Sequence, residues 1–181
     1  GPGGRGLPAA VAPVDPDGPE PRRLRGTGAR IVENMDRSLA VPTATSVREV
    51  PAKLLEVNRR IINNYLKRID GGKVSFTHLI AYAMVRALDE VPAMVRRYTE
   101  VDGRPAVLEG GPVGLGLAVD VPASDGGRSL LVPVIADATT LDFAGFVAAY
   151  EAVVRRIRAN DLDPAMFAGA TLTITNPGTI G

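Results

Sequence analysis

The 181-residue sequence contains no cysteine and no tryptophan, and it has a single histidine, His78. Without cysteine the chain has no disulfide framework, no thiolate metal site and no cysteine nucleophile. Aromatic residues make up only 4% of the chain, so a core must be built mainly from Val, Leu, Ile, Ala and Met. His78 is therefore the only imidazole within the chain that could act as a base.

Charge of one sign is also lacking. The chain carries 21 basic and 20 acidic residues, a formal net charge of +1. A balanced charge argues against a general nucleic-acid or membrane-surface binder. Apolar runs are too short to span a bilayer, and no signal peptide is visible, although the chain begins with Gly1 rather than Met. We expect a cytoplasmic protein without a metal site, a nucleic-acid partner or a membrane partner.

The sequence predicts two parts, a linker over residues 1–23 and a folded domain over residues 24–181. Prolines interleaved with glycines and small residues fill the first part, which cannot bury enough apolar surface to fold. Such a spacer indicates that another segment is tethered upstream, and the alternative is a cloning or gene-prediction remnant. The whole chain is 45% apolar, and the second part is long enough for one core.

Hydrophobic periodicity predicts four helices in the second part. The first begins near Thr27 and ends before Pro42, and the second follows Pro51 with its arginines, including Arg59, on the solvent side. The third opens at Ser75 and ends before Pro92, and the fourth is capped by Thr140 or Asp142. The apolar stripe expected to face the core from the third helix comprises Phe76, Leu79, Ile80, Ala83, Met84, Ala87, Leu88 and Val91.

Strands are predicted between and after these helices. They cover residues 44–50, a hairpin at 94–99 and 105–108, residues 113–121, residues 130–135 with both faces covered, and residues 171–175. Turns are expected at 101–104, 125–127 and 176–178. The order indicates a mixed sheet with helices packed on it, an α/β fold of the α+β type.

The last stretch of the sequence, residues 170–181, is predicted to be a buried strand that ends in hydroxyl and amide side chains, and the rest of the domain is organised around it. Thr175 and Asn176 follow the apolar part of this strand and could hold a ligand or an oxyanion. The simpler interpretation is that both satisfy the backbone of the turn. Since no linker composition precedes Gly181, we expect the sequence to be a piece of a larger protein, cut within its fold.

Several stretches together resemble the acyltransferase (E2) catalytic domain of 2-oxoacid dehydrogenase complexes. Their order and spacing hold from about residue 24 to residue 181. They are R-I-V-E-N-M-D-R-S at 30–38, V-S-F-T-H-L-I at 74–80, G-L-G-L-A-V at 114–119, L-L-V-P-V-I at 130–135 and F-A-G-A-T-L-T-I-T-N-P-G at 167–178. Within the family, residues 41–48, 61–64 and 175–181 and the proline-rich front resemble an actinobacterial subgroup. In that subgroup, the multifunctional 2-oxoglutarate dehydrogenase/decarboxylases, this domain precedes a thiamine diphosphate-dependent part.

The resemblance implies a chloramphenicol acetyltransferase-like fold, here truncated at its C-terminus, and a homotrimer with active sites between subunits. Coenzyme A and lipoamide are the implied substrates, and a lipoyl domain and dihydrolipoamide dehydrogenase the implied partners. Thiamine diphosphate and Mg²⁺ belong to the expected downstream part. Thr175 and Asn176 match the family's donors to the tetrahedral intermediate, while the catalytic histidine of its D-H-R motif is expected beyond Gly181. Coenzyme A contacts are not assigned.

Other candidates have simpler explanations. His78 lies in the first turn of a predicted helix without a flanking Asp or Arg, which indicates a structural or merely exposed side chain. Gly114 and Gly116 lack the third glycine and the following helix of a dinucleotide-binding fingerprint, so strand glycines are the better interpretation. Arg155, Arg156 and Arg158 could touch a coenzyme A phosphate, but a solvated helix end is simpler.

The resemblance predicts transfer of a succinyl group from dihydrolipoamide to coenzyme A, in a chain that continues into a 2-oxoglutarate decarboxylase. The 181 residues alone are expected to be inactive. Gly28-Ala29 and Thr43 stand where typical members have Arg-Lys and a histidine, which leaves two alternatives open. One is a non-catalytic trimerising scaffold for the decarboxylase, and the other is a stand-alone E2 with another acyl specificity.

Overall fold

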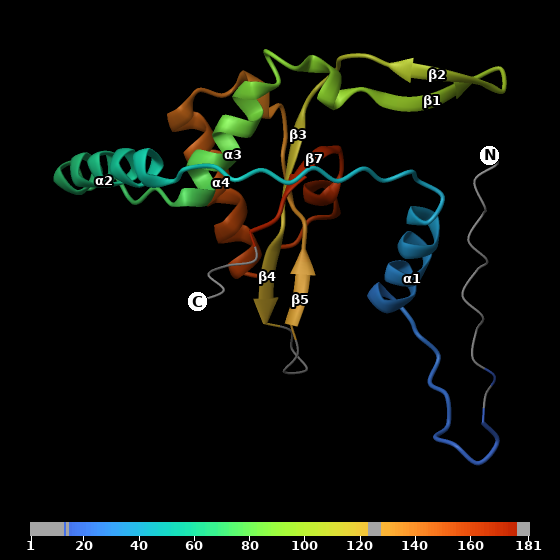
Figure 1. Ribbon diagram of the computed structural model, residues 1–181. Coiled ribbons are helices and arrows are strands. Elements are labelled where there is room, and N and C mark those ends of the chain that lie inside the picture. The colour runs from blue at the N-terminus through green and yellow to red at the C-terminus, as the bar shows by residue number, and fades with distance from the viewer. Residues whose placement is uncertain (1–12, 14, 123–127, 177–181) are drawn as a thin grey trace. The chain divides into compact units, whose positions relative to one another are not determined.

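A computed structural model describes residue 13 and residues 15–122 and 128–176 of the chain (Figure 1). It divides the chain into two compact units, residues 1–49 and residues 50–181. The expected turns at 125–127 and after Asn176 lie outside the described residues. No helix in the described part is long and apolar enough to cross a membrane.

The first unit contains one helix, α1 (Thr27–Ser38). Gly26 occupies the N-cap position, so the helix includes Thr27 instead of being capped by it. Glu33 and Arg37, one turn apart on its surface, form an ion pair of 2.6 Å. The expected apolar face, with Ile31, Met35 and Leu39, is exposed. Periodicity therefore identified the helix, but the described residues supply no cover for its apolar side.

The strand expected over residues 44–50 is absent, and this prediction was wrong. The stretch is exposed along its whole length and has no regular structure. Thr and Val suit a pleated surface, but a strand also needs a neighbour that accepts and donates backbone hydrogen bonds. No described strand pairs with this stretch.

The second unit contains three longer helices, α2 (Lys53–Arg68), α3 (Phe76–Ala87) and α4 (Phe143–Arg158). The predicted caps of the last two are confirmed. Ser75 Oγ accepts a hydrogen bond from the backbone N–H of His78, and Asp142 Oδ1 accepts one from that of Gly145. These bonds satisfy backbone donors that the first turn of a helix leaves unpaired.

The face that α3 buries differs from the predicted stripe. Its buried residues are His78, Ala81 and Val85, while Phe76 and Ile80 are exposed. The helix is apolar around most of its circumference, so periodicity does not determine which side packs. Arg59 of α2 is half-buried and not on the solvent side, with its guanidinium carbon 4.3 Å from the centre of the exposed Phe76 ring.

A three-stranded sheet forms the centre of the second unit, in the order β6 (Val134–Ile135), β3 (Gly114–Leu117) and β7 (Ala170–Ile174). β3 runs antiparallel to β6 and parallel to β7, which confirms the predicted mixed sheet. Strand β7 was expected at 171–175 and ends one residue earlier. All four residues of β3 are buried, because strands flank both of its edges and helices pack nearby.

Two of the predicted strands are each divided in two. Residues 113–121 form β3 and β4 (Val119–Pro122), and residues 130–135 contribute to β5 (Arg128–Leu131) and β6. β4 and β5 pair with each other as a separate antiparallel ribbon. Pro133 has no N–H, which interrupts the ladder between the two segments. Residues 130–135 were expected to be covered on both faces. This prediction is confirmed at Ile135, which is 2% exposed, and wrong in β5, where Leu130 is 63% exposed.

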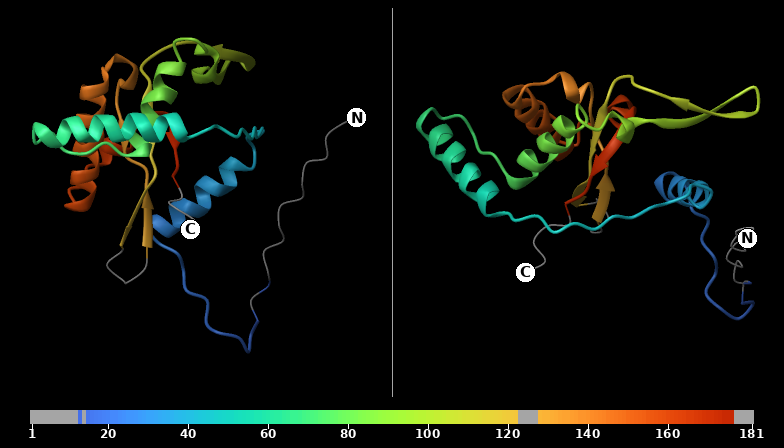
Figure 2. Two further views of the ribbon diagram at one scale, coloured as in Figure 1. Left: turned by 60° about the vertical axis from the view of Figure 1, so that its left-hand side comes forward. Right: turned by 45° about the horizontal axis from the view of Figure 1, so that its top comes forward.

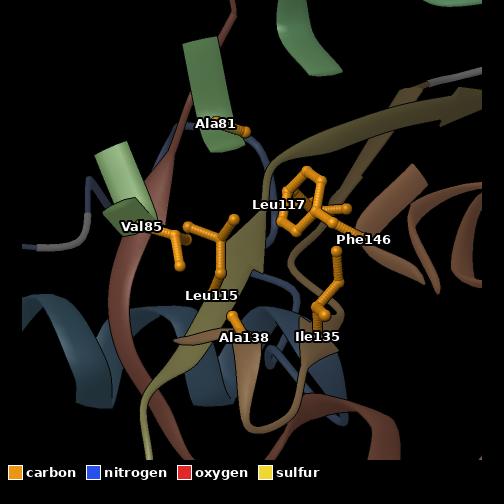
Figure 3. Close-up of a cluster of buried hydrophobic side chains, with 7 residues drawn as sticks. All are labelled: Ala81, Val85, Leu115, Leu117, Ile135, Ala138 and Phe146. Carbon is orange, nitrogen blue, oxygen red and sulfur yellow. The ribbon is translucent and has the colours of Figure 1, made fainter. Parts of the chain in front are cut away.

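The core lies between this sheet and the helices. Figure 3 shows its seven buried side chains converging from α3, β3, β6, α4 and the short helix η2 (Ala138–Thr140). They are Ala81, Val85, Leu115, Leu117, Ile135, Ala138 and Phe146. As expected, aliphatic residues dominate, and Phe146 is the one aromatic member of the cluster.

The remaining strands form the predicted hairpin, β1 (Arg97–Val101) and β2 (Arg104–Leu108). The first strand was expected over 94–99 and begins three residues later, because residues 92–95 form a short helix. Asp102 and Gly103 connect them with positive φ angles of 52° and 69°, as a two-residue hairpin turn requires. In Figures 1 and 2 the hairpin extends away from the helices of its unit. The short helices η1 (Pro92–Val95) and η3 (Pro164–Phe167) complete the second unit.

Candidate functional site

The carboxyl end of β7 borders a cavity of about 340 Å³. Strands β3 and β4, the first turn of α3 and one side of α4 form the rest of its wall. The lining residues are Ser75, Thr77, His78, Leu117, Ala118, Val119, Asp120, Tyr150, Glu151, Val154, Arg158, Ile174 and Asn176. Polar groups from four separate segments therefore meet at one end of the central sheet.

Asn176 is the predicted site residue that reaches this cavity. Its Nδ2 donates a hydrogen bond of 2.8 Å to Thr77 Oγ1 in the first turn of α3. Thr175 is exposed and does not line the cavity. The two candidates of the sequence analysis thus lie next to each other in the chain, but only the amide side chain belongs to the cavity wall.

The first turn of α3 is fixed by a reciprocal capping arrangement between Ser75 and His78. His78 Nδ1 accepts a hydrogen bond of 2.9 Å from the Ser75 backbone N–H, and Ser75 Oγ accepts one of 3.3 Å from the His78 N–H. The Ser75 hydroxyl also lies 2.7 Å from Nδ1. Glu or Gln usually completes such a capping box, and here an imidazole takes that place.

This arrangement fixes the protonation of the His78 ring. Because Nδ1 accepts a backbone N–H, the proton of the neutral ring is on Nε2. Nε2 lies 3.1 Å from Glu151 Oε1, which is within ion-pair distance, but the geometry does not meet that of a hydrogen bond. Burial lowers the pKa of His78 below its usual value, and the nearby Glu151 opposes that shift. His78 is 3% exposed, so the geometry fits the structural interpretation and not an exposed side chain.

Tyr150 of α4 packs on this ring, with the two ring centres 4.0 Å apart. Burial raises the pKa of Tyr150, and Glu151 acts in the same direction. Arg158 and a hydrogen bond with the Thr77 side chain act in the opposite direction on that pKa. The tyrosine hydroxyl is therefore neutral at physiological pH and belongs to the same polar group as Thr77.

The arginines at the end of α4 lie in different surroundings. Arg158 lines the cavity, and Arg156 Nε forms an ion pair of 2.7 Å with Asp161. Arg155 is exposed. The ion pair with Asp161 explains the position of Arg156. Of these three arginines, only Arg158 lines the cavity. The contact with a coenzyme A phosphate that the sequence suggested for all three arginines therefore concerns Arg158 alone.

Gly114 and Gly116 occupy positions where a side chain would collide with neighbouring strands. A Cβ at Gly114 would lie 2.1 Å from the Gly169 carbonyl oxygen, and one at Gly116 would lie 2.8 Å from Thr173 Oγ1. β4 follows them, not a helix. Close packing of strands explains both glycines. Among the described residues there is also no group of His, Asp and Glu side chains suited to hold a metal ion.

Sequence reasoning missed Thr77, Tyr150 and Glu151 as neighbours of Asn176. Thr77 and Asn176 are 99 positions apart, and their contact depends on how α3 packs against the end of β7. One local signal was available, since Ser75 and His78 have the spacing of a capping box. That signal indicates where α3 begins, but not what lies opposite its first turn.

A family model for the catalytic domain of 2-oxoacid dehydrogenases acyltransferase matches residues 17–181. The chain is 51% identical over 173 residues to the multifunctional 2-oxoglutarate metabolism enzyme of Mycolicibacterium vanbaalenii. That match covers 96% of this chain and 14% of the relative, so the chain spans about one seventh of the length of the curated relatives it matches.

Two solved structures are similar in fold. Dihydrolipoamide acetyltransferase of Azotobacter vinelandii matches with a TM-score of 0.75 and 27% identity, over 95% of this chain and 69% of that one. A serine, a histidine and an asparagine of that enzyme have been investigated for their role in catalysis. A truncated catalytic core of the Thermoplasma acidophilum 2-oxoacid dehydrogenase multienzyme complex matches with a TM-score of 0.70 and 28% identity, over 90% and 71% of the two chains.

The motifs, the mixed sheet and these similarities agree on one assignment. The family match extends over most of the chain and includes both the end of β7 and the cavity beside it. The chain belongs to the 2-oxoacid dehydrogenase acyltransferase family and carries sequence of its catalytic domain.

Proposed function

We propose that this chain is part of an acyltransferase that passes a succinyl group from dihydrolipoamide to coenzyme A. The family supplies the reaction type, and the similarity to multifunctional 2-oxoglutarate metabolism enzymes supports succinyl as the acyl group. One structural observation carries the proposal. The side-chain amide of Asn176 is held at the wall of a cavity, at the strand end where the family resemblance expects a donor.

The reaction exchanges one thioester for another. The coenzyme A thiolate attacks the carbonyl carbon of the S-succinyl group, the carbonyl oxygen becomes an oxyanion, and the dihydrolipoamide sulfur leaves with the bonding pair and takes up a proton. N–H or O–H donors stabilise the oxyanion as it forms. We assign this role to the Asn176 amide and the Thr175 hydroxyl.

His78 is unsuited to be the base that deprotonates the thiol. It is buried, its Nδ1 lone pair accepts the Ser75 N–H, and its Nε2, which carries the proton of the neutral ring, lies 3.1 Å from Glu151 Oε1. A general base must reach the proton it removes. We therefore assign the base to a histidine outside these 181 residues, as the resemblance implies.

The same proposal includes an assembly. We infer a chloramphenicol acetyltransferase-like fold, a homotrimer with sites between subunits, and a lipoyl domain and dihydrolipoamide dehydrogenase as partners. A downstream part of the protein would use thiamine diphosphate and Mg²⁺ to decarboxylate 2-oxoglutarate, in the cytoplasm. The similarity to solved cores of 2-oxoacid dehydrogenase complexes supports the assembly.

The test is a transfer assay on the complete natural protein, with succinyl-dihydrolipoamide and coenzyme A as substrates. Asn176→Ala and Thr175→Ala are each expected to lower kcat by about 10²-fold, the usual effect of removing one oxyanion donor. Asn64→Ala, at an exposed asparagine on α2, is the matched control and should leave kcat unchanged. Faster transfer of acetyl than of succinyl would contradict the acyl specificity and favour a stand-alone E2.

A scaffold without transfer chemistry is the second candidate. The observation that favours it is the departure from the family pattern at Gly28-Ala29 and Thr43. A complete protein that forms a trimer but transfers no acyl group would support this candidate. Transfer by the wild-type protein that is abolished in Asn176→Ala would exclude it.

A further inference from the structure

The cavity wall contains a contact that links α3 to the end of β7. Thr77 is the second residue of α3, and its Oγ1 accepts the 2.8 Å hydrogen bond from Asn176 Nδ2. The contact joins residues 99 positions apart, and it ties the residue assigned to the oxyanion to the first turn of α3.

Thr77 lies on a well-anchored turn. Val74 before it is 1% exposed and Ala81 after it is fully buried. Asn63 of α2 holds Val74 from the other side, with its Nδ2 donating to the Val74 carbonyl at 2.9 Å and its Oδ1 accepting from the Val74 N–H at 2.7 Å. Backbone and core contacts on both sides therefore determine where the Thr77 hydroxyl lies.

Asn176 lies two residues beyond Ile174, the last residue of β7, where the ladder that holds β7 to β3 has ended. An amide nitrogen has two hydrogens in one plane, so a bond from one of them to a fixed acceptor also sets the direction of the other. Donors aimed in advance at a developing oxyanion are more effective than donors that must reorient during the reaction.

We propose that Thr77 is the positioning residue for Asn176, holding the side-chain amide at the end of β7 in the orientation that acyl transfer requires. This inference rests on the proposed function and adds a residue that acts through Asn176. It is independent of the size of the acyl group, because the contact fixes the amide and not the pocket around the acyl chain.

Two substitutions separate the hydroxyl from the shape of the side chain. Thr77→Val keeps the branched shape and removes the acceptor, and it should lower kcat by about tenfold, less than the loss of a whole donor. KM for coenzyme A should stay within about twofold, because orientation of the donor matters in the transition state and not in substrate binding. Thr77→Ser retains a hydroxyl and should restore kcat to within about twofold of wild type.

A double-mutant cycle in the complete protein distinguishes positioning from general stability. If Thr77 acts through Asn176, then Thr77→Val should have no further effect on kcat once Asn176 is alanine. A tenfold loss in both backgrounds would overturn the proposal, as would a Thr77→Val enzyme with wild-type kcat. Melting temperatures of all variants identify any loss due to unfolding, and Thr77→Ala would then replace Thr77→Val in the cycle.

The two proposals fail in different ways. A wild-type protein without acyl transfer to coenzyme A contradicts the proposed function. An active wild type whose Asn176→Ala variant is impaired, but whose Thr77→Val variant is not, contradicts only the role of Thr77.

Discussion

Strand β3 and the β1–β2 hairpin differ in what determines them. All four residues of β3 are buried, with β6 on one edge and β7 on the other. In the hairpin only Thr99 and Ala106 are even half-buried, and the two strands pair with nothing but each other. The Asp102-Gly103 turn makes the hairpin a local structure, whereas β3 depends on contacts with residues distant in the sequence.

The difference shows what each region contributes. β3 supplies Leu115 and Leu117 to the core and ends at the cavity, so its exact position sets the site. No residue of the hairpin lines that cavity. An isolated two-stranded hairpin is only marginally stable in water. Substitutions in β3 should therefore affect the whole second unit, and those in the hairpin should have local effects.

The largest effect is expected for Gly114→Ala. Its Cβ would lie 2.1 Å from the Gly169 carbonyl oxygen, and backbone cannot move aside as a side chain can. We expect destabilisation of more than about 3 kcal/mol, above the usual cost of overpacking. Gly103→Ala in the hairpin turn is the control, because its Cβ would meet nothing within 4 Å. Its cost in unfolding free energy, about 1–2 kcal/mol, comes from the positive φ alone. Denaturant unfolding measures both, and equal losses would contradict the comparison.

The next effect compares two leucines. Leu115 in β3 is 0% exposed and Leu108 in β2 is 47% exposed. Leu115→Ala should cost about 3–5 kcal/mol through lost burial and the cavity left behind, and Leu108→Ala less than about 1 kcal/mol. Thermal unfolding of the two variants side by side checks this ranking. A Leu108→Ala variant as unstable as Leu115→Ala would show that the hairpin is covered by a partner in solution.

A smaller effect depends on pH and concerns His78, which lines the same cavity as Leu117 of β3. Burial lowers the pKa of His78 in the folded chain from 6.5, so below that pH the unfolded state binds the proton more readily. Stability should therefore fall as the pH drops below about 6.5, by at most about 1.4 kcal/mol per pH unit, with no loss above it. His78→Gln keeps a capping partner for Ser75 and should remove this part of the pH dependence. An unchanged pH profile of the melting temperature in that variant would contradict the assignment.

The smallest effect is expected at the hairpin turn. Asp102 has a φ of 52°, which Asn and Asp tolerate better than Ala. Asp102→Ala should destabilise the hairpin by about 1 kcal/mol or less, while Asp102→Asn should be neutral because Asn-Gly suits this turn. Hydrogen exchange should rise in β1 and β2 and stay unchanged in β3. Faster exchange in β3 as well would show that the two regions are coupled.

The same contrast explains how much of the fold was predictable. Asp102-Gly103, Ser75 and Asp142 act on residues within four positions, and the elements they define were predicted correctly. Residues 44–50 have strand-like composition, but their structure depends on a partner strand that the described chain lacks. The buried side of α3 was mispredicted because Phe76 and Ile80 are as apolar as Ala81 and Val85, and only the position of the sheet distinguishes them.

The site was predictable to a similar degree. Asn176 was chosen as a candidate because a family motif marks the end of β7. His78 was interpreted as structural or merely exposed from its place in a helix turn, and its burial fits the first of these alternatives. Thr77 was missed because a threonine in that turn has no sequence signal, and its partner lies 99 residues away. Whether Thr175 acts in catalysis stays a prediction.

The capping box at the start of α3 also has a consequence for chemical modification. His78 accepts a backbone hydrogen through its one basic nitrogen and is buried, so electrophiles such as diethyl pyrocarbonate have no lone pair to attack. The only histidine of these 181 residues is thus expected to be unreactive toward a reagent commonly used to detect catalytic histidines. If that reagent inactivates the complete protein, we expect the modified histidine responsible to lie outside these 181 residues.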